Sequence, residues 1–370
     1  MIEKIAKISL LATALLLSGC GGDNDYNGTG VIGSETSESQ GDALASLQEN
    51  VFLKDSQSLL SSATSLKTTA ESFDKNLTQS DITGMQTTFK TLMQSWKSVQ
   101  NAYVAADYDN ALIDIPQLFD YYHTGKKLDI PADIDSALAS SGSIEDALFK
   151  NSSKSINALE YLLFGHSQTL SELTLLMNKE NRRRVDALKV VTRNLERLSE
   201  QIAAYYKADT KFVANAQDAS NSIVNVLIDS AFKLKEWRIG EPSGIAVKFK
   251  DSPDPARLEY VKSLLSTEAI KAILETHQRI IGKQSYANFG SFASDNGAAA
   301  VVTEIQNRLD KAEKIINGFN KPMEALITTT SYDPQLDRLY ATVKTLQELY
   351  FTSLIQALDL TAEIIEADGD

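Results

Sequence analysis

The chain has 370 residues, 43% hydrophobic and 23% charged, a composition that excludes disordered and collagen-like proteins. The formal charge is −13, from 36 Lys and Arg against 49 Asp and Glu, so the electrostatic field disfavours nucleic acid as a partner and favours a cationic ligand or a metal ion. One cysteine excludes a disulfide framework and a thiolate-rich metal site, and three histidines leave few ligands for zinc.

Residues 1–19 have the layout of a secretory signal, because two lysines precede an apolar run that is too short to span a bilayer. The run ends in Leu-Ser-Gly-Cys, which resembles the bacterial lipobox, so we predict that Cys20 is lipidated and anchors the chain to a membrane. The alternative is ordinary cleavage that leaves a free thiol. Gly21 rather than Asp follows, which by the sorting rule of such lipoproteins favours the outer membrane, facing the periplasm.

Residues 20–42 are rich in Gly, Asp, Asn, Ser and Thr, and we expect them to form the lipidated cysteine and a flexible tether. From about residue 43 the apolar residues recur at helical spacing, without the alternation typical of strands. The sequence therefore predicts an all-α fold of two packed helical bundles, at 43–210 and 211–370. The clearest apolar stripes lie at 92–106, 185–205 and 336–354, and the main breaks at 107–135, 240–255 and 282–297.

Glu160 falls inside the apolar arc of a helical segment at 155–165. A carboxylate in such an arc requires an ion pair, hydrogen bonds or a bound cation, since burial otherwise raises its pKa. The alternatives are a hydrated helix end and a structural ion pair. Asn157, nearly one turn earlier, is either a carbonyl ligand or a polar neighbour.

Asp107 extends the stripe of Trp96 and Tyr103 by four residues, so Tyr103 and Asp107 are expected to face the same interior if the helix runs that far. A turn aspartate is the alternative. Arg184 lies on the apolar side of its helix and is a candidate counter-ion for an inward carboxylate, although arginine runs more often form a solvated face.

Several catalytic signatures are absent from the sequence. It contains no HExxH, no GxSxG, no Walker-type loop and no dinucleotide-binding glycine loop. Zincin, serine-hydrolase and nucleotide chemistries therefore lack their usual signals.

Two segments resemble the imelysin-like family, also called peptidase family M75. Trp96, Tyr103 and Asp107 are similar to the family's first helix, where Gln100 replaces the usual Arg and Asp107 the usual Glu. The family's GxHxxE motif, followed by ExLLxG, is similar to residues 155–165: Glu160 and Gly165 match, whereas Ser155 replaces the Gly and Asn157 replaces the His.

The later part of the chain carries further family-like positions. They are Gly240, Pro242 and Gly244 in an LGxPxG-like loop, and Glu259, Ser263 and Ser266 beyond it. The resemblance implies two helical bundles with a site where they meet, near Glu160.

The resemblance implies an iron-related function. Glu160, Asn157, Asp107 and Tyr103 are the candidate ligands, and an all-oxygen set suits iron or another hard cation better than zinc. We expect a lipoprotein that binds a cation or iron species and assists iron acquisition, with an outer-membrane receptor or related lipoprotein as partner. The alternatives are an M75-type metallopeptidase, disfavoured because Asn157 replaces the motif His, and a non-catalytic scaffold that binds a partner protein.

Overall fold

The described part of the chain consists of helices joined by loops. The computed structural model describes residues 35–73, 75–124, 128–165, 169–179 and 181–362. These ranges contain no β-strand, only an isolated bridge between Ile327 and Tyr332, so the all-α prediction is confirmed. From Thr36 onward the helices belong to one compact unit, and the division into two domains at residue 210 stays a prediction. Cys20 and the expected signal peptide lie outside the described residues.

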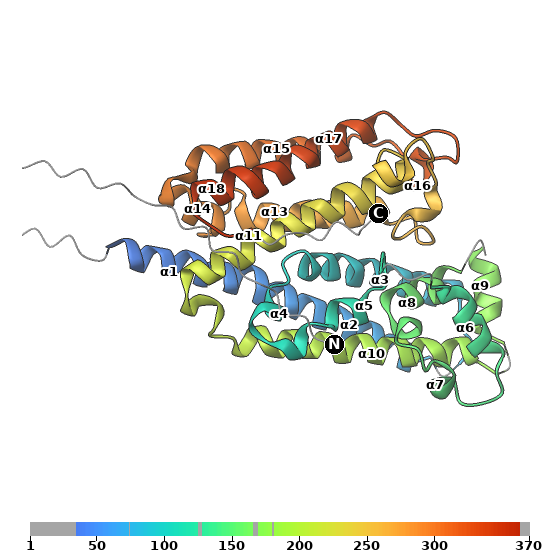
Figure 1. Cartoon of the computed structure of the whole chain (residues 1–370). Coiled ribbons are helices and arrows are strands. Elements are labelled where there is room, and N and C mark those ends of the chain that lie inside the picture. Colours follow the sequence, from blue (N-terminus) through green and yellow to red (C-terminus); the bar gives the residue numbers. More distant parts are fainter. Residues whose placement is uncertain (1–34, 74, 125–127, 166–168, 180, 363–370) are drawn as a thin grey trace, which may run out of the picture. The chain divides into compact units, whose positions relative to one another are not determined.

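Three long helices form the first layer. α1 (Glu35–Leu47) begins inside the segment expected to be a tether and continues through a π-helical turn (Gln48–Leu53) into α2 (Lys54–Glu71). α2 packs against both α3 (Gln79–Gln100) and α10 (Arg183–Ala208), as Figure 1 shows. Shorter helices connect α3 to α10: α4 (Ala105–Tyr108), α5 (Ile115–Phe119), α6 (Ile130–Ala139), α7 (Ile144–Ala147), α8 (Ile156–Phe164) and α9 (Leu170–Met177).

The remaining helices form a second group. α11 (Ala216–Lys233) continues through the π-helical segment η5 (Leu234–Gly240) into α12 (Glu241–Ser243). α15 (Ala299–Asn317) packs against α13 (Ser266–Ile281) and α17 (Gln335–Glu348), and α17 also contacts α11. The short helices here are α14 (Phe289–Ala293), α16 (Met323–Leu326) and α18 (Ile355–Ala357), the last reached through a π-helical turn (Leu349–Leu354).

The apolar stripes seen in the sequence form the core. Trp96, Leu195 and Leu339, one from each stripe, are fully buried. α3 is the element that joins the two groups, because it packs on α2 with one side and on α13 with another. Its carboxyl end therefore lies where both groups can contribute side chains. None of the described helices is both long and apolar enough to cross a membrane.

Candidate functional site

The helix that carries the degenerate motif is short and has defined ends. Ser155 is the N-cap of α8: its hydroxyl accepts a hydrogen bond from the Ala158 amide at 3.4 Å and donates to the Ser152 carbonyl at 2.7 Å. Gly165 ends the helix with a φ of 67°, a left-handed conformation that favours glycine. These two motif positions thus place Asn157 in the first turn of α8 and Glu160 in its middle.

Glu160 points inward, as the sequence predicts, and its side chain is held by hydrogen bonds. The residue is 3% exposed, and its Oε1 accepts from the Ser263 amide at 2.9 Å and the Ser263 hydroxyl at 2.7 Å. Burial raises the pKa of Glu160 to about 7, although the Ser263 hydrogen bonds and the nearby Lys262 act in the opposite direction. Two family-like positions, Glu160 and Ser263, therefore join α8 to the loop before α13.

The oxygen of Asn157 already has partners. Its Oδ1 accepts a hydrogen bond from the Tyr121 amide at 2.7 Å and lies 3.4 Å from the Ser155 hydroxyl. Asn157 therefore fixes the backbone at Tyr121, so its amide has a structural role.

Asp107 and Tyr103 do not extend the stripe of Trp96. α3 ends at Gln100, where Asn101 turns its side chain onto the Lys97 carbonyl at 2.7 Å, so Asp107 lies in the separate helix α4. Burial raises the pKa of Asp107, and a hydrogen bond from Ser222 on α11 opposes this effect. Tyr103 donates to the Leu112 carbonyl at 2.9 Å. These neighbours differ from those of Glu160, so the expected common interior for Tyr103 and Asp107 is not formed by one continuous helix.

Arg184 is buried, but not as a counter-ion for Glu160. Its Nε donates to the Leu162 carbonyl at 3.0 Å and its Nη2 to the Tyr161 carbonyl at 2.8 Å. Both carbonyls belong to the last turn of α8; the Tyr161 carbonyl also accepts from the Gly165 amide at 2.9 Å. The predicted counter-ion role is therefore wrong, and Arg184 caps the end of the motif helix.

Trp96 positions a buried aspartate. Its ring stacks on Phe119 with centroids 4.1 Å apart, and its Nε1 donates to Asp120 Oδ2 at 2.9 Å. The same oxygen accepts from Lys97 Nζ at 2.8 Å. Burial alone raises the pKa of Asp120, but the Lys97 ammonium and the Tyr122 amide bring it down to about 2. Asp120 is therefore ionised.

A second ion pair completes what we call the buried ion cluster: Lys97, Asp120, Arg238 and Glu259. Lys97 Nζ also bonds Glu259 Oε1, and Arg238 binds the same carboxylate through two nitrogens, at 2.7 and 3.1 Å. Two cations face two carboxylates, so their charges balance, as burial requires. Gln100 Oε1 accepts from Lys97 Nζ at 2.7 Å and from Arg238 Nη2 at 3.4 Å.

Sequence reasoning missed three members of this cluster: Lys97, Asp120 and Arg238. One signal was available, namely Gln100 in place of the family's usual Arg. The loss of that cation beside an inward site indicates a replacement cation nearby, and Lys97, one turn earlier on α3, is fully buried. Arg238 lies on η5, and π-helical segments often occur at functional sites.

The LGxPxG-like loop holds η5 in place. A Cβ on Gly240 would lie 2.9 Å from a ring carbon of Tyr340, so only glycine allows this approach. Gly244 has a φ of +73°, and the Pro242 carbonyl accepts from the Asp254 amide at 2.8 Å. Ser266 begins α13, and its hydroxyl accepts from the Tyr260 amide at 3.3 Å. These positions fix the chain that carries Arg238 and Glu259.

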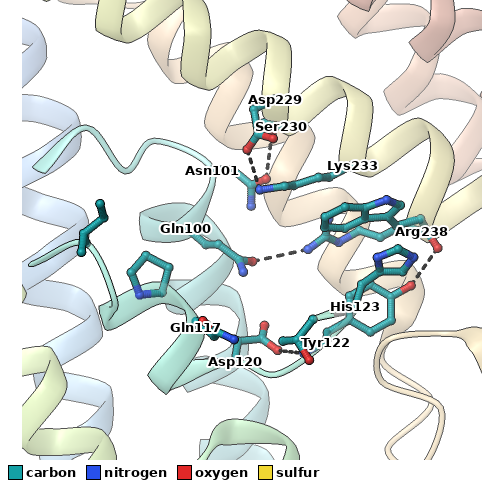
Figure 2. A pocket seen from close by; sticks show the side chains of 14 residues that line it. Gln100, Asn101, Gln117, Asp120, Tyr122, His123, Asp229, Ser230, Lys233 and Arg238 are labelled. Atoms are coloured by element: carbon teal, nitrogen blue, oxygen red, sulfur yellow. Dashed lines mark hydrogen bonds and ion pairs between the residues drawn. The ribbon is translucent and has the colours of Figure 1, made fainter. Parts of the chain in front are cut away.

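A cavity of about 400 Å³ lies beside the ion cluster, at the carboxyl end of α3. Figure 2 shows Gln100, Tyr122, His123 and Arg238 around it. His123 has a φ of 57° and stacks on Trp237 with centroids 4.0 Å apart, while its Nε2 lies 3.0 Å from both oxygens of Glu241. A second hollow of about 470 Å³ shares Tyr122, His123 and Thr124 with the first and reaches Asn157.

One pair at the cavity has the composition of a nucleophile and a base, namely Ser230 and His277. The Asn101 amide nitrogen binds the Lys97 carbonyl, so its oxygen accepts the Ser230 hydroxyl proton at 2.7 Å. His277 Nε2, 2.7 Å from the same hydroxyl, must then be the protonated nitrogen. Burial lowers the pKa of His277 to about 3. His277 thus donates to Ser230 and cannot take its proton, so the pair is structural.

Metal-binding groups are sparse in the part of the chain that the structure describes. Within it, no three His, Cys, Asp or Glu residues lie close enough to hold a metal ion. Glu160 is therefore not part of a group of three or more such residues there. The chemistry that the arrangement favours is hydrogen bonding and charge pairing with a bound molecule.

The sequence matches the imelysin family profile, Peptidase_M75, over residues 53–350. The fold is similar to that of an imelysin-like protein from Psychrobacter arcticum 273-4, with a TM-score of 0.65, 15% identity, and coverage of 88% of this chain and 98% of that one. It is also similar to a "putative iron-regulated protein A precursor" from Parabacteroides distasonis ATCC 8503, with a TM-score of 0.69, 12% identity, and coverage of 89% and 97%. No curated protein matches the sequence. Because the profile spans most of the chain, this protein belongs to the imelysin family.

Proposed function

We propose that this protein is an outer-membrane lipoprotein that faces the periplasm, binds an iron species and assists iron acquisition. Membership of the imelysin family supports the proposal, as does a fold shared with a structure described as an iron-regulated protein precursor. The observation that carries the binding role is the cavity beside the buried ion cluster. Its walls hold polar side chains in fixed orientations, as a binding site requires.

The form in which iron binds follows from the state of the candidate ligands. Glu160 Oε1 already accepts two hydrogen bonds, and Asn157 Oδ1 is taken by a backbone amide. We therefore propose that iron is bound as a complex with its own organic ligands. A bare hard cation at Glu160 and Asn157 is the competing form, and it would have to displace Ser263 and Tyr121.

Peptidase activity is not part of the proposal. A metallopeptidase needs a metal-activated water and a general base. The motif position that supplies an imidazole in the family is Asn157 here, and its amide takes up no proton in the neutral pH range. The Ser230–His277 pair also lacks a free base nitrogen. Binding is thus the role that these residues support.

Calorimetric titration of the purified chain tests the binding role. Ferric citrate, ferrous sulfate, calcium chloride and zinc chloride are added in turn to wild type and to Glu160→Gln. We expect an iron compound to bind at micromolar concentration and Glu160→Gln to bind it unchanged. Strong binding of a bare ion that Glu160→Gln abolishes would favour the competing form.

Cellular experiments test the location and the physiological role. We expect Cys20→Ala to release the protein from the outer-membrane fraction. Deletion of the gene is expected to slow growth only when iron is limiting, and the wild-type chain is expected to restore growth. If no iron compound binds and growth under iron limitation is unchanged, the proposed function is wrong.

A further inference from the structure

Three buried polar atoms on the walls of the 400 Å³ cavity lack hydrogen-bond partners. They are Arg238 Nη1, His123 Nδ1 and Thr124 Oγ1, each with no partner among the described residues. Buried polar atoms in folded proteins are nearly always hydrogen-bonded, so each such atom requires an explanation. Arg238 Nη1 and Thr124 Oγ1 are donors, and a ligand that supplies acceptors explains both of them. His123 Nδ1 is the acceptor nitrogen of a neutral ring, because Nε2 faces the Glu241 carboxylate, so a carboxylate does not explain it.

Arg238 offers the most informative of the three atoms. The residue is 4% exposed, and Glu259 occupies one edge of its guanidinium through Nε and Nη2. Nη2 also reaches Gln100, so only Nη1 keeps both of its protons without an acceptor. An arginine held in this way presents a rigid, charged donor, and carboxylates are its preferred acceptors.

Gln100 adds a second donor beside Arg238. Its Oε1 is turned toward Lys97 and Arg238 by two hydrogen bonds, so the amide cannot flip without placing its NH2 group against two cations. The NH2 group therefore points away from the ion cluster, and Figure 2 shows Gln100 lying across the cavity from His123. Sequence reasoning treated Gln100 only as a departure from the family pattern.

The other walls supply a flat surface and one more cation. His123 and Trp237 stack with an interplanar angle of 13°, and Lys233 lies over the Trp237 ring, 5.3 Å from its centroid. Both acidic residues of the cavity lining are already paired, Asp120 with Lys97 and Asp229 with Lys233. A bound cation would therefore find no free carboxylate, whereas an acceptor-rich ligand would meet free donors.

We propose that this cavity binds a small organic carboxylic acid in its ionised form. The carboxylate accepts from Arg238 Nη1 and the Gln100 NH2 group, Thr124 donates a further hydrogen bond, and the remainder of the molecule lies against the His123–Trp237 stack. A volume of about 400 Å³ is within the range of small-molecule sites. The inference deepens the proposed function, since carboxylates are oxygen ligands of ferric iron.

Calorimetry with iron-free citrate, succinate and acetate tests the inference on the purified full-length chain. Trimethyl citrate is the neutral control, because it keeps the carbon skeleton of citrate and removes the three charges. We expect at least one of the acids to bind and trimethyl citrate not to bind. If none of the three acids binds at about 10 mM, the proposal is overturned, because a dissociation constant above that concentration is too weak for a specific binding site.

Two variants locate the binding. Thr124→Val removes a hydroxyl that has no partner, so it is expected to leave the thermal midpoint unchanged and to weaken binding about tenfold, or about 1.4 kcal/mol. Thr64→Val, at an exposed position on α2, is the matched control. Arg238→Lys is expected to weaken binding further, and if it fails to fold, Thr124→Val decides the question. Wild-type affinity in Thr124→Val would overturn the assignment.

The iron and carboxylate proposals can fail separately. If citrate binds in the cavity while ferric citrate binds no better and growth under iron limitation is unaffected, the carboxylate site stands and the iron function fails. If iron salts bind and no iron-free carboxylate does, the carboxylate site is wrong and the iron function stands.

Discussion

The replacement Glu160→Gln tests whether the motif acid is buried as tightly as its contacts indicate. Glutamine has the same shape, and its Oε1 can accept the same bonds from Ser263 without carrying a charge. Burial raises the pKa of Glu160 from 4.5 to about 7 in the folded chain. The folded state thus binds this proton more tightly than the unfolded state does, so the contribution of Glu160 to stability is highest below about pH 4.5 and is lost as the pH rises through 7.

The size of the effect follows from the same pKa difference. At 1.36 kcal/mol for each tenfold change in proton affinity, the difference between 4.5 and about 7 is worth about 3 kcal/mol. Relative to wild type, Glu160→Gln is therefore expected to gain about 3 kcal/mol of stability between pH 4.5 and pH 8.

Urea unfolding of both proteins at pH 4.5, 5.5, 6.5 and 8 measures this gain, because the difference between them removes the titration of all other groups. Glu145→Gln, at an exposed position on α7, controls for the loss of a surface carboxylate. A difference between Glu160→Gln and wild type that is the same at every pH would refute the reasoning, and Glu160 would then be hydrated or paired with a cation.

Three further replacements test the supports of the site. Lys97→Met removes the cation that pairs with both Asp120 and Glu259 in the interior. It is expected to lower the free energy of unfolding, measured by urea titration, by about 3–5 kcal/mol. A loss below about 1 kcal/mol would show that the cluster is hydrated. Gly240→Ala forces a Cβ against Tyr340 and is expected to lower the free energy of unfolding by about 1–3 kcal/mol. Gly84→Ala, at a helical position with open space around it, is expected to raise the free energy of unfolding by up to about 1 kcal/mol. Equal thermal midpoints of the two variants would contradict the packing argument. Arg184→Met removes the hydrogen bonds to the end of α8 and is expected to lower the free energy of unfolding by about 1–3 kcal/mol. The pH dependence assigned to Glu160 is expected to stay the same. A change in that pH dependence would show that Arg184 is a counter-ion of Glu160 after all.

Local patterns in the sequence predicted the features that depend on one helix. The inward position of Glu160 follows from the spacing of its apolar neighbours, and the structure confirms it. The same logic failed for Asp107, because an apolar stripe does not say where a helix ends. α3 ends where the Asn101 side chain donates a hydrogen bond to the Lys97 carbonyl, and the spacing of apolar residues does not predict this bond.

Features that depend on pairing between distant segments could not be derived in this way. Arg184 is inward, but its partners are carbonyls of another helix, which the sequence does not identify. Lys97 and Glu259 are 162 positions apart, and neither carries a periodic signal for the other. The family resemblance pointed to Glu259 and Ser263 as positions of interest, whereas their partners required the structure.

The buried ion cluster has a consequence for the alignment of the helices around it. The pair Lys97 and Asp120 is neutral by itself, and so is the pair Arg238 and Glu259. The bonds that cross from one pair to the other, through Lys97 and Gln100, are therefore not needed to cancel charge. We expect them instead to set the register of α3 against η5, because sliding by one helical turn would break every crossing bond at once. The shape of the cavity beside them is then fixed by the side chains that make the crossing bonds, Lys97, Gln100, Arg238 and Glu259.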